Sequence, residues 1–267
     1  MENPQDLVHD LLVPNRVNSK RAWWLLLVLT AVAPSVRAET PARAKALLDK
    51  VDDLYRGKSA HGKMTMKVTT VHWTRELSLE FWSKGKERSL IRILAPQKEK
   101  GTTTLKVGKE MWNYLPKVDR VIKVPSSMMG GSWMGSHFTN DDLVKESRMA
   151  EDYDTAISFE GTREGAEVIE LSSIPKKDAA VVWGKVVTLV RKADLIPVKV
   201  DYYDEDLHLA RRMTFSDVKK MGGRLLPTVL RVVPTDKPNE STEIVYHQVE
   251  FDVDLPDNLF TLRNLQR

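Results

Sequence analysis

The chain has 267 residues, of which 42% are hydrophobic and 29% are charged, a composition typical of a globular protein rather than a disordered one. Its 41 basic and 37 acidic residues are interspersed and give a net charge of +4, which argues against the concentrated basic surface of a nucleic-acid-binding protein. The sequence has no cysteine, which excludes disulfides, thiolate metal sites, cysteine nucleophiles and a lipid anchor on an N-terminal cysteine.

Residues 1–38 have the pattern of a secretory signal peptide. The basic pair Lys20-Arg21 precedes an apolar run at 22–33, and a Val-Arg-Ala sequence at 36–38 is typical of a cleavage site. A buried helix is the alternative, but two adjacent tryptophans directly behind a basic pair favour a signal peptide. The apolar run is shorter than the roughly 18 uncharged residues that a membrane-spanning helix needs. We therefore expect export to the cell envelope and no stable membrane insertion of the mature chain.

The mature chain, residues 39–267, is predicted to be a single domain that begins with one helix. Thr40-Pro41 is typical of an N-cap followed by the first helical residue. Apolar residues then recur at three- and four-residue spacings from Ala44 onward, and Gly57 is a C-terminal stop signal. The pattern predicts an amphipathic helix of about four turns, whose apolar stripe must pack on another element.

Beyond this helix the hydrophobic period changes from 3.6 to 2, which predicts strands. Strand-like runs, most of them bounded by Gly, Pro, Asp or Asn, lie at residues 64–68, 77–82, 87–94, 102–107, 109–115, 118–124, 153–160, 166–173, 183–191, 197–203, 207–218, 224–234 and 241–251. Short strands joined by tight turns predict a mainly β fold, an antiparallel meander. Because open twisted sheets rarely exceed ~10 strands, we expect this sheet to curl or close around the helix.

The segment 125–136 breaks the pattern because it has no charged residue and contains three methionines, three glycines and a tryptophan. Glycines make a backbone mobile, and methionines offer an adaptable apolar surface. The segment is predicted either to cover an apolar ligand as a lid or to plug one end of the barrel permanently. Three aromatic residues elsewhere suit either a core or a cavity wall. The candidate ligand-binding residues are Met128, Met129, Trp133, Met134, Phe138, Trp82, Trp112 and Tyr114.

No catalytic or metal-binding motif is present: the chain has no G-x-S-x-G, H-E-x-x-H, P-loop or G-x-G-x-x-G sequence. His137, Asp141 and Asp142 lie close together, but their spacing matches no metal-ligand signature. We predict instead that Thr139 caps a short helix whose first turn holds the two aspartates. No catalytic residue, metal site or cofactor is therefore predicted.

A second group of carboxylates surrounds a predicted hairpin turn at residues 203–206. The group consists of Asp201, Asp204, Glu205 and Asp206. Aspartate and glutamate at a turn are usually solvated, so we interpret all four as turn residues rather than as an acid–base pair.

Several sequence words are familiar when they are taken together. They are LYRGKS at 54–59, MWNYLP at 111–116, SWMGS at 132–136 followed by FTNDDL at 138–143, and FTLRNL at 260–265. These words resemble the periplasmic outer-membrane lipoprotein-sorting proteins of the LolA/LolB-like superfamily. One position departs from the resemblance, because His137 stands where we expect an acidic residue.

The resemblance implies an incomplete antiparallel β-barrel wrapped around helices, with an apolar cavity for acyl chains, no enzyme activity and no cofactor. The implied partners are the acyl chains of lipoproteins or other lipids, and an inner-membrane transporter is a further candidate. We therefore expect a periplasmic carrier that transports such cargo toward the outer membrane. Two alternatives stay open: a non-catalytic accessory subunit of an envelope transporter with a filled barrel, and an envelope lipid or glycan hydrolase whose nucleophile is not recognised.

Overall fold

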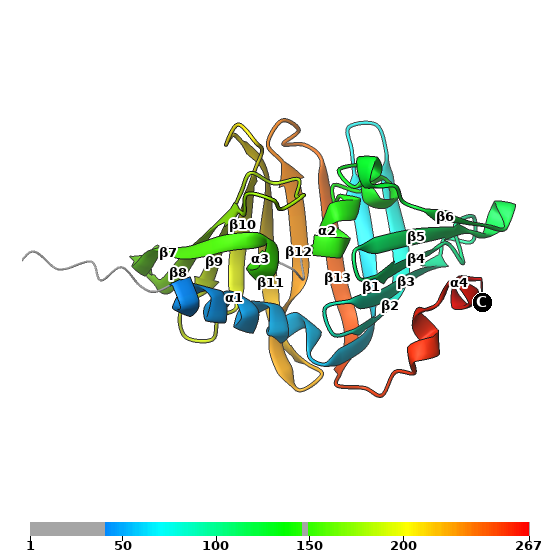
Figure 1. Cartoon of the computed structure of the whole chain (residues 1–267), viewed down its shortest axis with the longest axis horizontal. Coiled ribbons are helices and arrows are strands. Elements are labelled where there is room, and N and C mark those ends of the chain that lie inside the picture. The colour runs from blue at the N-terminus through cyan, green and yellow to red at the C-terminus, as the bar shows by residue number, and fades with distance from the viewer. Residues whose placement is uncertain (1–40, 146–148, 267) are drawn as a thin grey trace, which may run out of the picture. The chain divides into compact units, whose positions relative to one another are not determined.

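Thirteen β-strands form one sheet in the computed structural model, which describes residues 41–145 and 149–266 (Figure 1). The strands are β1 Ser59–Thr69, β2 Thr74–Lys84, β3 Arg88–Ala95, β4 Thr103–Val107, β5 Glu110–Leu115, β6 Arg120–Lys123, β7 Tyr153–Arg163, β8 Ala166–Pro175, β9 Lys185–Arg191, β10 Pro197–Tyr203, β11 Leu209–Met221, β12 Arg224–Pro234 and β13 Ser241–Phe251. The predicted mainly β fold is confirmed. The predicted signal peptide at 1–38 and the predicted cap at Thr40 lie outside the described residues.

The strand order is β6-β5-β4-β3-β2-β1-β13-β12-β11-β10-β9-β8-β7, and every neighbouring pair is antiparallel. Strands that follow one another in the chain are neighbours, with one exception. Strands β6 and β7 lie at opposite edges, because β13 pairs with β1 in the middle of the sheet. The barrel is therefore incomplete, as expected, and the chain between β6 and β7 connects its two free edges.

Four α-helices accompany the sheet in the described part of the chain, with short 3-10 turns between them. The α-helices are α1 Pro41–Arg56, α2 Asn140–Lys145, α3 Met149–Asp152 and α4 Leu262–Leu265. The 3-10 turns are η1 Pro116–Val118, η2 Ser126–Met128, η3 Trp133–Gly135 and η5 Asp257–Phe260. Figure 1 shows α1, α2 and α3 on the same side of the curled sheet, across its concave face. No helix among the described residues is long and apolar enough to span a membrane.

Helix α1 forms where the apolar spacing predicts it. Its buried stripe of Ala44, Leu48 and Val51 packs against Leu171 and other apolar residues of β8 and β9. It also carries the i,i+4 ion pairs Lys45–Asp49 and Asp52–Arg56, which stabilise the helix. The helix ends at Gly57, which has a φ of +59° and leaves no room for a side chain, since a Cβ would lie 2.8 Å from Asp252 Oδ1.

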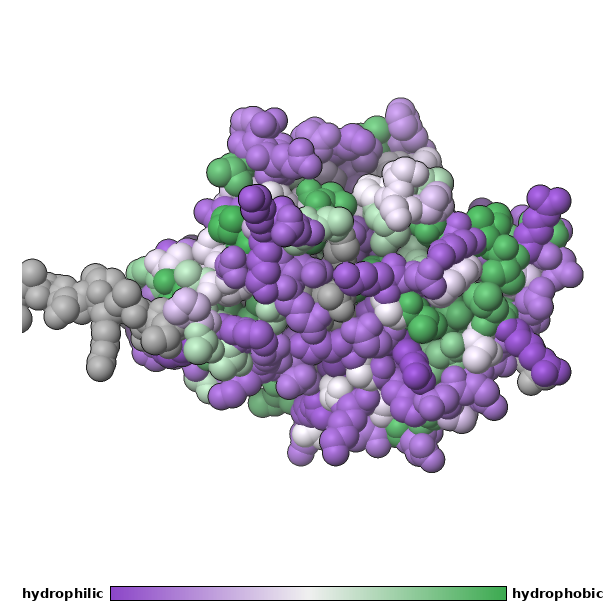
Figure 2. All heavy atoms as spheres, viewed as in Figure 1, coloured by the Kyte–Doolittle hydropathy of each residue, from purple (hydrophilic) through white to green (hydrophobic). Residues whose placement is uncertain are grey.

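The two faces of the sheet bury different sets of side chains. Alternate residues of β1 and β2, including Met66 and Leu79, point to the concave face and join its core. The opposite face of β3 and β4 is covered by the C-terminal segment, where Phe260 and Leu265 pack on Leu90. The C-terminal FTLRNL sequence at 260–265 therefore packs over the convex face and is not part of the concave core. Beside it, Figure 2 shows a hydrophobic patch over β5 and β6.

One interpretation of the acidic residues is wrong. Asp204, Glu205 and Asp206 do lie in the exposed turn between β10 and β11, but Asp201 is buried within β10. Arg212 donates from Nε to Asp201 Oδ1 at 2.5 Å and from Nη2 to Oδ2 at 2.9 Å. The cause is the register of the hairpin, which places Asp201 directly opposite Arg212. Asp201 is therefore the buried partner of a cross-strand ion pair.

Candidate ligand-binding site

A cavity of about 260 Å³ lies between the concave face of the sheet and helices α1, α2 and α3. Its wall is mainly apolar, and the larger contributors from the sheet are Met64, Phe81, Ile91, Met213, Phe215, Leu230 and Tyr246. For comparison, an engineered apolar cavity of about 150 Å³ is large enough to bind benzene. The concave face is therefore not completely filled by its own side chains, and the remaining space suits an apolar guest.

The uncharged segment is anchored in this wall by Trp133, which is 1% exposed. Its Nε1–H donates to Thr104 Oγ1 on β4 at 3.1 Å, and the Thr104 hydroxyl donates to Asn113 Oδ1 on β5 at 2.7 Å. A buried indole usually needs such a partner for its N–H group. Trp133 thus joins the connection between β6 and β7 to the strands on one side of the gap.

The segment is also held together by its own hydrogen bonds. The Trp133 backbone N–H donates to Phe138 O at 2.8 Å, and the Asp141 N–H donates to Met129 O at 2.8 Å. Of the three glycines expected to give mobility, only Gly135 has a positive φ, +70°, and it follows Met134, whose φ is +49°. The glycine at 135 therefore permits a specific tight turn rather than general freedom.

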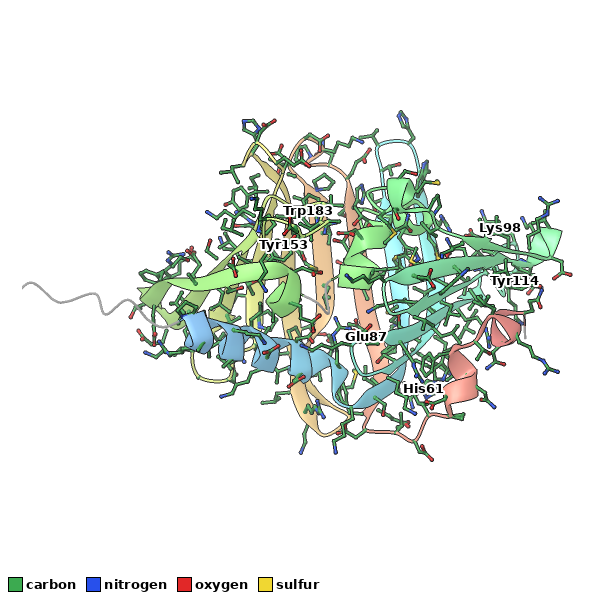
Figure 3. The ribbon with its side chains drawn as sticks, in the orientation of Figure 1. His61, Glu87, Lys98, Tyr114, Tyr153 and Trp183 are labelled. Atoms are coloured by element: carbon green, nitrogen blue, oxygen red, sulfur yellow. The ribbon has the colours of Figure 1, made fainter. Side chains whose placement is uncertain are left out.

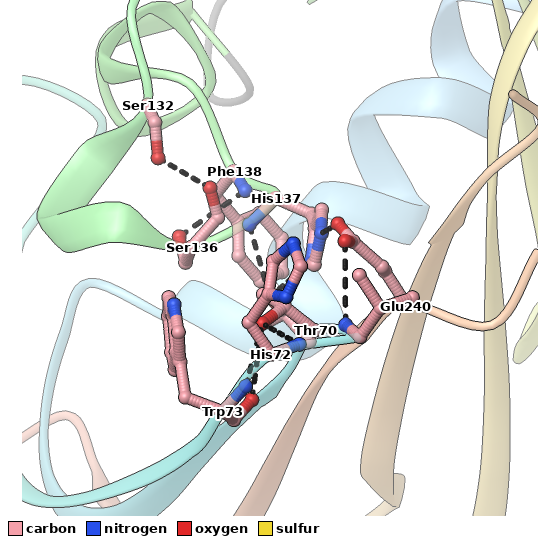
Figure 4. A network of polar contacts seen from close by, with 10 residues as sticks. Thr70, His72, Trp73, Ser132, Ser136, His137, Phe138 and Glu240 are labelled. Atoms are coloured by element: carbon pink, nitrogen blue, oxygen red, sulfur yellow. Dashed lines mark hydrogen bonds and ion pairs between the residues drawn. The ribbon is translucent and has the colours of Figure 1, made fainter. Parts of the chain in front are cut away.

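His137 connects the segment to the opposite hairpins (Figure 4). Its backbone N–H donates to Thr242 Oγ1 at 2.9 Å, and its Nδ1 also lies 2.9 Å from that oxygen. Its Nε2 lies 3.3 Å from Glu240 Oε2, and the hydrogen bond from His137 lowers the pKa of Glu240 below its usual range. Glu240 Oε1 in turn accepts a hydrogen bond from the Val71 N–H at the β1–β2 turn.

This arrangement of hydroxyl, imidazole and carboxylate has the order of a nucleophile–base–acid triad. However, the Thr242 hydroxyl already accepts the His137 backbone N–H, and Thr242 is completely buried. None of Thr242, His137 and Glu240 lines the cavity. The contacts therefore fit a structural tie between three loops better than a catalytic site.

Helix α2 begins with the predicted capping arrangement. The Asp142 N–H donates to Thr139 Oγ1 at 3.1 Å, and the Thr139 N–H donates to Asp142 Oδ2 at 2.6 Å, which is a reciprocal capping box. Within residues 41–145 and 149–266, no group of three or more histidine, cysteine, aspartate or glutamate side chains is placed to hold a metal ion. Asp141 and Asp142 both lie in the first turn of α2, as their spacing indicates.

A buried arginine completes this end of the cavity. Arg211 donates from Nη1 to Asp142 Oδ2 at 2.8 Å and from Nη2 to Asp142 Oδ1 at 2.6 Å, and Nη1 also donates to His137 O at 2.8 Å. Its Cζ lies 4.4 Å from the Trp183 ring centroid and 4.2 Å from that of Tyr202. Aromatic faces and a bidentate carboxylate are the surroundings in which a buried guanidinium is stabilised. Arg211 thereby fixes α2 to β11.

Tyr153 lies at the same end, close to Trp183 (Figure 3). Its hydroxyl donates to Trp183 O at 3.1 Å. Burial and the neighbouring charges of Asp141 and Asp142 raise the pKa of Tyr153 well above its usual range. The phenol is therefore neutral at physiological pH and acts as a hydrogen-bond donor in the cavity wall.

The opposite end of the cavity is charged and lies between α1 and the β2–β3 turn. Lys86 Nζ lies 3.0 Å from Asp49 Oδ1 and 3.6 Å from Asp52 Oδ2, and Arg56 Nε donates to Asp52 Oδ1 at 2.6 Å. Burial opposes ionisation, but hydrogen bonds from Lys45 and Lys86 lower the pKa of Asp49. Burial likewise opposes the charge on Lys86, but Asp49 and Asp52 raise its pKa. Asp49 and Lys86 are therefore both ionised at neutral pH.

The structure brings only some of the predicted ligand-binding residues to the cavity. Trp133, Phe138 and Trp82 contribute to its wall. Met129 and Met134 are partly buried and pack against the concave core without lining the cavity, whereas Met128 is 58% exposed.

The three aromatic residues outside the uncharged segment share a location on the other face. Trp82, Trp112 and Tyr114 all pack against the cluster beneath the C-terminal segment. Trp82 also stacks on His61, with ring centroids 5.3 Å apart. Tyr114 lies far from Tyr153 and Trp183 in Figure 3. Trp112 and Tyr114 thus belong to the convex face, and Trp82 is shared between this cluster and the cavity wall.

Sequence reasoning missed Arg211, Trp183 and Tyr202. A signal for Arg211 is present, because it lies two and four residues before Met213 and Phe215, which share its strand and line the cavity. Because side chains alternate between the two faces of a strand, this spacing places the Arg211 cation on the same apolar face as Met213 and Phe215. No comparable signal marks its partners, which come from β10, α2 and the connection before β9.

Comparison with solved structures gives close matches over most of the chain. A DUF1329 family protein from Desulfovibrio piger has 25% sequence identity and a TM-score of 0.77, and the match covers 84% of this chain and 98% of that one. A domain assigned to outer membrane lipoprotein sorting from Vibrio parahaemolyticus has 22% identity and a TM-score of 0.76, with coverages of 85% and 100%. A LolA superfamily protein from Nitrosomonas europaea has 21% identity and a TM-score of 0.71, with coverages of 83% and 98%.

These matches confirm the LolA-like fold that the sequence words predicted. The comparison with curated proteins finds no match. A family model described as "Uncharacterized protein" matches residues 85–267, which is more than half of the chain. The chain therefore belongs to this family, and it has the incomplete β-barrel of the LolA-like superfamily.

Proposed function

We propose that this protein is a non-catalytic carrier of the periplasm, which binds the acyl chains of lipoproteins or other lipids and transports them toward the outer membrane. The observation that carries the proposal is the apolar cavity of about 260 Å³ between the sheet and the helices. The lipoprotein-sorting domain and the LolA superfamily protein, which have the same fold, support it. An inner-membrane transporter is a candidate partner that would load the carrier.

The physical need for such a carrier follows from the cost of exposing hydrocarbon to water. Each methylene costs about 0.8 kcal/mol, so a sixteen-carbon chain costs on the order of 12 kcal/mol. A protein that buries the chain between apolar side chains removes most of this cost. The cargo then leaves when an acceptor binds it more strongly, and no bond needs to be made or broken.

The proposal is tested by identifying what the protein contains when it is isolated from the envelope without detergent. Solvent extraction and mass spectrometry should find lipid in a near-stoichiometric amount. Leu230→Trp places a large side chain in the cavity wall and should reduce the bound lipid several-fold. Leu225→Trp is the matched control, because Leu225 lies on the same strand but is exposed.

A second candidate function is a non-catalytic accessory subunit of an envelope transporter with a filled barrel. The complete burial of Trp133 and its hydrogen bond to Thr104 favour it, because a permanent plug has these features. This candidate predicts that the isolated protein contains no lipid and that Leu230→Trp changes nothing except stability. Equal lipid contents in the two tryptophan variants would therefore contradict the carrier.

A further inference from the structure

The charged end of the cavity differs from the rest of its wall. Asp49, Asp52 and Arg56 come from the last turns of α1, and Lys86 comes from the β2–β3 turn. Figure 3 shows this turn, marked by Glu87, beside the end of α1. The same turns of α1 also contribute Leu48 and Val51 to the apolar wall. A molecule in the cavity would therefore meet hydrocarbon and fixed charges within one helical turn.

Solvent exposure distinguishes the two polar ends of the cavity. The side chains of Asp49, Lys86, Arg56 and Asp52 are 33%, 30%, 22% and 16% exposed, whereas those of Asp142 and Arg211 at the other end are 9% and 5% exposed. Water therefore reaches the cavity between α1 and the β2–β3 turn rather than beneath α2. A bound amphiphile would keep its polar head at this mouth, because moving a charged group to the buried end costs several kcal/mol.

The four charged side chains that line the mouth are two carboxylates and two cations joined by ion pairs, and Lys45, which does not line the cavity, also pairs with Asp49. A purely anionic head beside Lys86 would also face Asp49 and Asp52, and a purely cationic head would face Lys86 and Arg56. A zwitterionic head avoids both conflicts. Its anionic group can pair with a cation of the mouth in place of a carboxylate, and its cationic group can pair with a carboxylate in place of an ammonium, so the net charge of the mouth does not change.

We propose that the mouth formed by Asp49, Asp52, Arg56 and Lys86 binds the zwitterionic head of an amphiphile whose hydrocarbon lies in the cavity. The head's cationic group lies by the two aspartates, and its phosphate lies by Lys86 and Arg56. This inference rests on the proposed carrier function and specifies its ligand as a phospholipid-like zwitterion rather than a fatty acid or an anionic lipid.

The test compares three probes with the same hydrocarbon tail: dodecylphosphocholine, dodecyl phosphate and dodecyltrimethylammonium. Calorimetric titration of the lipid-free protein below the micellar concentration of each probe should find the zwitterion bound about tenfold more tightly than either other probe, which corresponds to about 1.4 kcal/mol of binding free energy. Lys86→Gln makes the mouth negative and should shift selectivity toward the cation. Asp49→Asn makes it positive and should shift selectivity toward the phosphate.

Controls separate local recognition from net charge and from folding. Lys123→Gln and Glu110→Gln change the same charges in an exposed ion pair outside the cavity and should keep the wild-type selectivity. Lys86→Arg keeps the positive charge and should also keep the wild-type selectivity. Shifts in the two mouth variants no larger than in these controls would overturn the headgroup assignment while leaving the carrier intact. Failure of the wild type to bind any probe would overturn both proposals.

Discussion

The ion pair between Arg211 and Asp142 should be the most sensitive polar contact of the cavity wall. Asp142→Asn preserves the shape of the side chain but removes the negative charge of Asp142 from the Arg211 guanidinium, which is buried between Trp183 and Tyr202. Removing one partner of a buried pair costs about 3–5 kcal/mol. Each kcal/mol shifts the Tm of a domain of this size by roughly 2–4 °C, so we expect a decrease of about 10 °C.

A double-mutant cycle separates the pair from its surroundings. Arg211→Met should also destabilise the protein, because it leaves Asp142 buried with the hydrogen bonds from Trp183 Nε1 and the Thr139 N–H as partial compensation. The double variant should cost about 1–3 kcal/mol less than the sum of the single variants. Arg231→Met is the control, because its ion pair is largely exposed and is worth at most about 1 kcal/mol. Additive costs measured by urea unfolding would refute the reasoning.

Three further predictions concern residues outside this ion pair. Met128→Asp should change the free energy of unfolding by less than about 0.5 kcal/mol, because the Met128 side chain is exposed. Met129→Asp should lower it by roughly 2 kcal/mol or more, because Met129 packs on the concave core. Chemical unfolding measures both values, and equal losses in the two variants would contradict the prediction. In a variant whose only tryptophan is Trp133, emission should already be blue-shifted without ligand, and a red-shifted spectrum would contradict the observed burial. Burial opposes ionisation of Asp201, but the hydrogen bond from Arg212 lowers its pKa. The stability of the protein should therefore fall as the pH drops below about 4, and it should fall less in Asp201→Asn. Thermal melts at several pH values measure both effects.

Local sequence patterns predicted most of the helices and strands of the fold. The change of period after Gly57 predicted both the helix and the strands, because an amphipathic helix and a half-buried strand each leave a regular trace. Asp201 was misjudged because burial depends on its cross-strand neighbour, and register is a property of two strands rather than one. The pairing of β1 with β13 is a long-range contact of the same kind, which no local pattern encodes.

The candidate site was harder to predict for the same reason. An alternating strand has two faces, and both faces of β2, β3 and β5 are covered by apolar material, the concave core on one side and the C-terminal segment on the other. Composition alone therefore could not assign Trp112 and Tyr114 to a face. Trp133 was found because its segment lacks charge over twelve residues, a signal that does not depend on strand register.

The topology of the sheet gives the apolar anchors of this segment a physical reason. Because β13 pairs with β1, the two free edges belong to strands that are consecutive in the chain, and the chain itself must cross the gap between them. Met129, Trp133, Met134 and Phe138 of this crossing pack on the concave core, where an unpaired charge would cost several kcal/mol, whereas Met128 is exposed. The topology therefore explains the apolar anchors of the segment, and it does not require the exposed positions between them to be uncharged. If ligand enters at the charged mouth beside α1, as we propose, this crossing can remain closed while the cavity fills and empties.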